Sequence, residues 1–185
     1  MGLIIGLVAA GVVILLLLWF VVTYNGLVQM RNRVQNAWSQ IDVQLKRRYD
    51  LIPNLVETVK GYATHERETL DKVTQARAAA MAATGVADQA QAENQLSQAL
   101  FNLRAVAEQY PDLKANQNFA QLQDDLTDTE DKIAFARQFY NDSVQRYDTK
   151  RQSIPTNIVA GIANFEANPY FEADTDSRSP VQVQF

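Results

Sequence analysis

The single histidine of this 185-residue chain, His65, is the first side chain to test as a general base or metal ligand. It stands in the sequence HERE (65–68), which lacks the second histidine of an H-E-x-x-H zinc site. A di-iron site on helices needs two E-x-x-H units, and Tyr62 occupies the position of the carboxylate. A serine triad would need a strained nucleophile turn, and the sequence contains no G-x-S-x-G motif. We therefore interpret His65 as an exposed polar residue.

Carboxylates cluster in the segment DDLTDTED (124–131), for which a calcium site is the alternative to a solvated acidic face. An EF-hand loop needs a central glycine, whereas this segment has none and lies inside a helical pattern. The chain has no cysteine and no glycine-rich phosphate loop, and its net charge of −4 disfavours nucleic acid. We predict no catalytic residue, no metal, no cofactor and no nucleic acid partner. The protein is therefore predicted not to be an enzyme.

Glu130 and Arg137 are the most informative charged residues, because they stand seven apart beside an apolar helical stripe. Residues at such an edge should be half buried, and Arg77 and Arg104 hold comparable positions on other segments. A buried charge is costly unless it is paired. We predict an ion-pair network of these four residues across a helical bundle, with exposed, unpartnered side chains as the alternative.

The segment from Leu3 to Val22 contains no charge and no polar side chain. Twenty helical residues rise about 30 Å, the hydrocarbon thickness of a bilayer. Trp19, Phe20 and Tyr24 follow at the end where aromatic rings favour the membrane interface. The apolar stretch is too long for a signal peptide and lacks a basic segment before it. Residues 1–24 are thus predicted to be a transmembrane anchor.

Arg31 and Arg33 follow this stretch, whereas no lysine or arginine precedes it. Because basic residues are enriched on cytoplasmic flanks, we predict a single-pass protein of the inner membrane with an outside N-terminus and a cytoplasmic helical domain. Gly2, Gly6 and Ala10 form a row of small residues on one helical face. Such rows let membrane helices approach closely, which predicts self-association unless the row is due to chance.

The chain from 25 to 165 shows the apolar periodicity of long helices. Gly85 and Pro111 interrupt the pattern, and Asn116 can cap the segment after them. Short connections favour antiparallel neighbours, so the fold class is all-α, an antiparallel bundle of three to four long helices with coiled-coil-like spacing. The stripe predicted for the middle segment comprises Ala92, Leu96, Ala99, Leu103, Val106 and Tyr110.

Pro53 interrupts a stripe that otherwise keeps its phase from Val34 through Val59 and continues to Val73. A proline inside a helix costs about 3 kcal/mol and kinks it, unless packing compensates. One kinked helix is therefore one interpretation. In the other, Asp50 ends one helix and Pro53 begins the next. In both, Asp50 and Pro53 form a hinge between the membrane-proximal segment and the bundle.

The last residues, 166–185, lose the periodicity and gain aspartate, serine and proline, which predicts a flexible tail. Its end, VQVQF, alternates apolar and polar residues. Val183 and Phe185 could add as a strand to the groove of a protein partner, with disorder as the alternative.

Several segments in order resemble the LemA family: YNGLVQMRNRVQNAWSQIDVQLKRRYDLIPNLVETVKGYATHE, YPDLKANQNF, TEDKIAFARQFYNDSV, IPTNIVA and YFEAD. The resemblance implies an N-terminally anchored, antiparallel helical-bundle membrane protein of bacteria without an established catalytic activity. Relatives are associated with internal membrane compartments and with genes of membrane-bound zinc proteases. The resemblance supplies no catalytic residues.

The sequence as a whole predicts a non-enzymatic, membrane-anchored scaffold or adaptor that self-associates and binds protein partners at the membrane lipid surface. The alternatives are an oligomer that shapes the membrane and an accessory factor of a membrane-bound quality-control protease.

Overall fold

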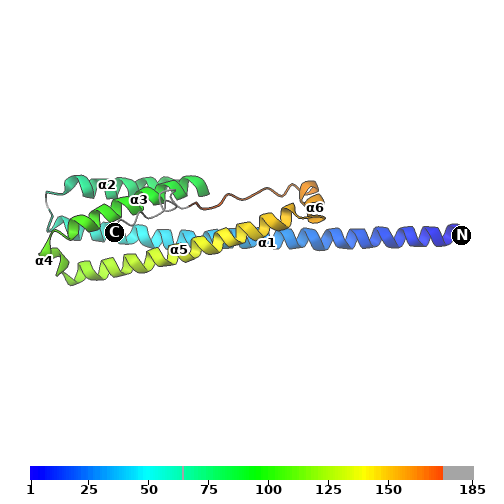
Figure 1. Ribbon diagram of the computed structural model, residues 1–185, viewed down its shortest axis with the longest axis horizontal. Coiled ribbons are helices and arrows are strands. Elements are labelled where there is room, and N and C mark those ends of the chain that lie inside the picture. Colours follow the sequence, from blue (N-terminus) through cyan, green and yellow to red (C-terminus); the bar gives the residue numbers. More distant parts are fainter. Residues whose placement is uncertain (64, 173–185) are drawn as a thin grey trace, which may run out of the picture. The chain divides into compact units, whose positions relative to one another are not determined.

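The computed structural model describes residues 1–63 and 65–172, and within these ranges the regular structure is entirely helical (Figure 1). The predicted all-α fold is therefore confirmed. The helices are α1 (Gly2–Lys60), α2 (Arg67–Ala82), α3 (Val86–Ala107), α4 (Pro111–Lys114), α5 (Gln117–Gln152) and α6 (Thr156–Ile162).

The chain divides into two compact units. The anchor unit comprises Met1–Ser39 and Phe139–Asn168, and the bundle unit comprises the described residues of Gln40–Gln138 together with residues 169–172. Helices α1 and α5 each contribute residues to both units. The division into an anchor (1–24), a bundle (25–165) and a tail (166–185) stays a prediction. Phe171, within that tail, is a buried side chain, and residues 173–185, with Val183 and Phe185, lie outside the described residues.

In the anchor unit, α1 has the length and composition to cross a membrane. Its most apolar 18-residue window has a mean hydropathy of 3.0, and none of that window is buried by the rest of the protein. An uncovered apolar surface of this length is unfavourable in water and requires another apolar medium. At its downstream end the rings of Phe20 and Tyr24 stack with centroids 6.5 Å apart.

Just beyond Tyr24, the anchor unit acquires a core of its own. Leu27 is fully buried, and the ring of Phe165, which follows α6, packs edge-on against Tyr24 at 5.6 Å. The guanidinium of Arg31 lies over the same Phe165 ring at 5.3 Å. The Tyr147 hydroxyl donates to the backbone oxygen of Glu166 at 2.8 Å, and burial raises the pKa of this tyrosine. These contacts hold the segment after α6 against the part of α1 that follows the apolar stretch.

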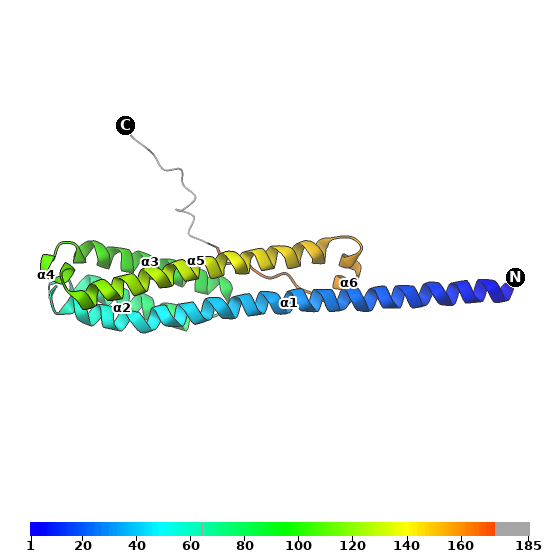
Figure 2. The same ribbon diagram turned by 90° about the horizontal axis from the view of Figure 1, so that it is seen from below.

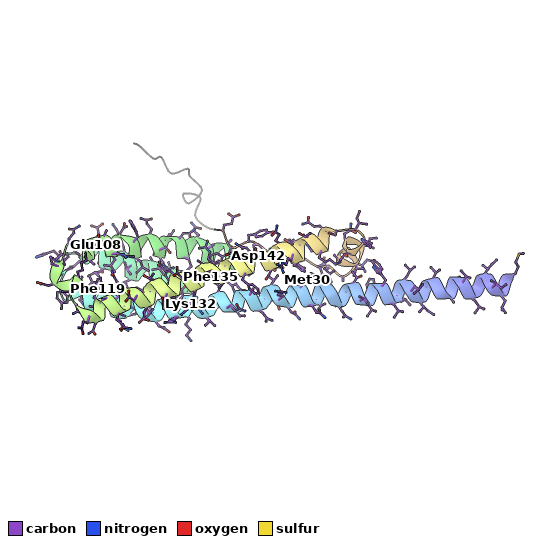
Figure 3. All side chains as sticks on the ribbon, turned by 60° about the horizontal axis from the view of Figure 1, so that its bottom comes forward. Met30, Glu108, Phe119, Lys132, Phe135 and Asp142 are labelled. Carbon is purple, nitrogen blue, oxygen red and sulfur yellow. The ribbon has the colours of Figure 1, made fainter. Side chains whose placement is uncertain are left out.

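In the bundle unit, α2 and α3 lie side by side along their length (Figures 1 and 2). Gly85 connects them with φ 83°, a left-handed conformation that glycine adopts without a Cβ penalty. Asn116 caps α5 as predicted, because its Oδ1 accepts the N–H groups of Asn118 and Phe119 at 2.9 and 3.2 Å. Figure 3 shows Glu108 near the end of α3 and Phe119 near the start of α5, on either side of α4.

Helix α1 continues through Pro53, so the one-helix interpretation is confirmed and the hairpin at Pro53 is wrong. The chain turns between Lys60 and Arg67, earlier than the stripe predicted, since the stripe continued to Val73. Gly61 begins this turn, and the N–H groups of Tyr62 and Ala63 both donate to the Val59 oxygen, at 3.0 and 2.8 Å. The apolar periodicity did not predict this turn. Val59 of α1 and Val73 of α2 are both buried, so the pattern of apolar residues looks the same on either side of it.

Candidate functional site in the bundle unit

A buried arginine of α1, Arg48, joins three helices of the bundle unit. Its Nη1 donates to Glu93 Oε2 of α3 at 2.9 Å. Its Nη2 lies 2.8 Å from Ser97 Oγ of α3 and 3.1 Å from Glu130 Oε1 of α5. The side chain of Arg48 is only 3% exposed, and that of Glu93 only 5%. Arg48 Nε is buried without a hydrogen-bond partner among the described residues. We therefore interpret this desolvated cluster as specifying which helix positions meet more than as adding stability.

Tyr49 and Gln89 complete the cluster beside Arg48. The Tyr49 hydroxyl donates to Glu93 Oε1, and Gln89 Nε2 donates to the Tyr49 hydroxyl oxygen at 2.9 Å. Gln89 Nε2 also lies 3.1 Å from the Ala80 carbonyl of α2. Burial, reinforced by the Glu93 carboxylate, raises the pKa of Tyr49, so its hydroxyl stays protonated as a donor. The buried polar cluster is defined as Arg48, Tyr49, Gln89 and Glu93, which are buried, together with Ser97 and Glu130 at its exposed edge. It reaches all four long helical segments of this unit.

Pro53 is accommodated by a specific hydrogen bond. Proline has no N–H, so the carbonyl four residues earlier, that of Tyr49, loses its helical donor. Arg77 of α2 supplies a replacement, because its Nε lies 2.8 Å from the Tyr49 oxygen. An arginine of one helix therefore completes the hydrogen bonding of another at the point where proline interrupts it.

The four residues of the predicted network are placed differently from the expectation. Glu130 pairs with Arg48, Arg77 binds the Tyr49 backbone, and the Arg137 guanidinium lies 4.9 Å from the Phe171 ring centroid. Burial lowers the pKa of Arg137, which the Glu93 charge partly opposes. Arg104 is exposed, and among the described residues it forms no ion pair within 4 Å. The predicted hinge residues, Asp50 and Pro53, lie inside α1.

The sequence interpretation missed Arg48 and Glu93, although a positional signal exists for both. Arg48 stands between Leu45 and Ile52 at spacings of three and four, inside the apolar stripe of α1. On α3 the buried positions are Gln89, Ala90, Glu93, Leu96, Leu100, Leu103 and Ala107, so only Leu96 and Leu103 of the predicted stripe are buried. The prediction placed Ala92 and Ala99 in the core because it used apolar residues only. It therefore assigned the buried Gln89 and Glu93 to the surface.

A cavity of about 390 Å³ opens between α1, α3 and α5, next to this cluster. Ser97 and Glu130 belong to both the cluster and the cavity wall. We call the cavity the α3–α5 groove. Its apolar lining comprises Leu55, Leu100, Leu103, Phe119 and Leu126. Phe101 stands at the groove 68% exposed, with Arg104 beside it.

His65 lies apart from this groove, whereas the acidic segment (124–131) contributes Leu126, Thr127 and Glu130 to its wall. His65 is exposed in the turn between α1 and α2. Asp125 of the acidic segment lies 3.5 Å from Arg47 in an exposed ion pair. Within residues 1–63 and 65–172, no group of three or more histidine, cysteine or acidic side chains could hold a metal ion.

Comparison with known proteins matches residues 37–185 to the model of the LemA family, which includes every residue of the buried polar cluster. The chain belongs to the LemA family. Protein LemA of Metamycoplasma hominis is 29% identical over 160 residues, covering 83% of this chain and 73% of that protein. Magnetosome protein MamQ 2 of Paramagnetospirillum magneticum and magnetosome protein MamQ of Magnetospirillum gryphiswaldense are each 25% identical over 184 residues, covering 85% of this chain and 68% of those proteins.

The LemA family match and the uncovered apolar segment of α1 together identify a membrane-associated helical protein. In this LemA-family chain, the residues that the family model covers include the whole bundle unit.

Proposed function

We propose that this chain is a membrane-anchored scaffold that self-associates through α1 and binds protein partners through the α3–α5 groove. The observation that carries the proposal is the groove itself, because an apolar lining with a polar rim and a protruding aromatic ring is typical of sites that bind a partner helix or segment. The partner class includes membrane-bound proteases. The α1 span provides the membrane attachment, with the N-terminus outside and the bundle unit cytoplasmic.

Two features of the bundle unit favour a scaffold over an enzyme. In the buried polar cluster the carboxylates of Glu93 and Glu130 both pair with Arg48, whose Nε has no hydrogen-bond partner among the described residues. Such a cluster fixes helix register and thereby presents the groove in one geometry. Within the cluster the Tyr49 hydroxyl is held protonated against Glu93, which is the wrong protonation state for a tyrosine nucleophile.

The groove is tested by photocrosslinking from two phenylalanines of matched exposure. Phe101 lines the groove, whereas Phe135, 72% exposed on α5, is outside its lining (Figure 3). With p-benzoylphenylalanine at either position in cells, we expect defined crosslinked bands from position 101 only, and their loss on the further change Gln98→Arg in the groove wall. Equal crosslinking from both positions, or insensitivity to Gln98→Arg, contradicts the groove as the binding surface.

Self-association through the small-residue face predicts a position-specific effect in the membrane. Gly2 and Gly6 are exposed, and nothing lies within 4 Å of an added Cβ at either one or at Gly11. The change Gly6→Leu places a bulky side chain in the Gly2, Gly6 and Ala10 row, whereas Gly11→Leu places it outside the row. We expect Gly6→Leu to lower the dimerisation affinity roughly tenfold, as measured by fluorescence energy transfer between labelled copies in liposomes. Gly11→Leu should leave this affinity unchanged. Equal effects of both changes would exclude this face.

A second candidate function is membrane shaping by an oligomer. The observation in its favour is that apolar side chains of the anchor unit are exposed beyond the span of α1, on and before α6. Two relatives are also named magnetosome proteins. Electron microscopy of liposomes with the purified chain separates the two functions, because a scaffold leaves the vesicle shape unchanged and a shaping oligomer does not.

A further inference from the structure

We propose that α6 is a second membrane-contacting element, which lies at the bilayer surface with Ile154, Ile158 and Ile162 inserted among the lipids. The proposal rests on the membrane anchoring of α1 and adds to it a specific contact of the folded anchor unit with the interface. Its occupant is lipid, at the depth of the headgroups and the first carbons of the acyl chains.

The first observation is the exposed face of α6. Ile154 lies in the turn just before α6, and Ile158 and Ile162 follow four residues apart on one side of the helix. They are 84%, 57% and 70% exposed, respectively. The protein buries the opposite side through Val159 and Ala160. Three exposed isoleucines on seven helical residues and their immediate flank are unfavourable in water, and α6 itself contains no charged residue that would oppose insertion.

The second observation is the place at which the protein holds α6. Asn164 adopts φ 52°, and the Phe165 N–H donates to the Ala160 oxygen at 3.0 Å, so Phe165 is part of the helix end. The Phe165 ring packs against Tyr24, two residues after the last residue of the apolar stretch. The carboxyl end of α6 is thus fixed where α1 leaves the bilayer, among the aromatic residues that favour the interface.

The charge around this point agrees with a lipid occupant. Arg31 lies over Phe165, and Lys150 is exposed in the last turn of α5, shortly before Ile154. The neighbouring Arg151 is paired with Asp148 at 3.1 Å. Arginine and lysine next to an inserted apolar face meet the phosphates of the headgroups, whereas a cover formed by a second copy would bring the same cations together. Lipid is therefore the occupant that these residues favour.

The absence of cysteine allows single-cysteine labelling of the full-length chain in phosphatidylcholine and phosphatidylglycerol liposomes. An environment-sensitive nitrobenzoxadiazole label is placed at Ile158→Cys, and its quenching by nitroxide lipids with shallow or deep spin labels is measured. The matched control on the same helix is Asn157→Cys, exposed but off the isoleucine face. Leu16→Cys reports the span. Asp142→Cys on α5 (Figure 3) reports an exposed site outside the membrane span. It stands three residues after Phe139, which contacts Arg33 of α1, and Arg33 lies roughly 13 Å along α1 from Tyr24.

We expect the label at position 158 to be quenched by shallow nitroxides at least about twofold more than the label at position 157, with little quenching at position 142. The label at position 16 should respond to deep nitroxides. Quenching at 16 without quenching at 158 overturns the proposal and leaves the anchoring intact. A blue-shifted but unquenched label at 158 also overturns it, because protein would then cover this face. No quenching at 16 contradicts the membrane anchoring on which the proposal rests.

Discussion

Replacing Arg48 by alanine is expected to lower the free energy of unfolding by about 3–5 kcal/mol, because the change leaves the buried Glu93 carboxylate without its cation. The neighbouring Arg47 is the matched control. Its side chain is 44% exposed and lies 3.5 Å from Asp125, so Arg47→Ala should cost less than about 1 kcal/mol. The measurement is urea unfolding of the full-length chain in mild detergent, followed by far-ultraviolet circular dichroism.

The double variant Arg48→Met, Glu93→Leu distinguishes pairing from packing. Because it removes both charges and keeps apolar volume, its cost should be well below that of Arg48→Ala. Photocrosslinking from position 101 should weaken in the same double variant, since Ser97 and Glu130 would lose the arginine that orders this wall of the groove. Equal costs for Arg47→Ala and Arg48→Ala would contradict the role assigned to the buried polar cluster.

Replacing Arg77 by alanine is expected to cost about 1.5–3 kcal/mol, but only while residue 53 is proline. Arg77 Nε is the donor to the Tyr49 carbonyl that Pro53 leaves without a helical partner. In a Pro53→Ala background the alanine N–H can donate to that carbonyl, and the cost of Arg77→Ala should fall below about 1 kcal/mol. The two single variants and the double variant form a cycle, measured by the same urea unfolding.

The cycle separates this hydrogen bond from the general packing of Arg77. If Arg77→Ala costs the same in both backgrounds, the side chain acts through packing alone and the carbonyl is not its target. The Pro53→Ala variant of this cycle also tests the predicted hinge in the crosslinking and energy-transfer experiments. If it crosslinks and assembles like the parent, the function does not depend on bending at the proline.

Several properties could be predicted from the sequence because they depend on local chemistry. The uncharged stretch from Leu3 to Val22 is long and apolar enough to cross a membrane, a property that its composition alone sets. Asn116 caps α5 because its side chain reaches N–H groups only two and three residues away. The stripe that passes Pro53 in phase indicated one helix, and α1 is one helix there.

Other properties were decided by tertiary structure, because they depend on residues distant in sequence. Burial of Arg48 requires Glu93, Ser97 and Glu130 to converge on it, and neither α1 nor α3 alone contains that information. Hydrophobicity patterns assign charged residues to the surface, so they mislocated the α3 stripe and missed the cluster. The sequence by itself determined an anchored, all-helical chain. Tertiary structure decided which polar residues its core contains, because a buried charge is stable only where other helices supply its partners.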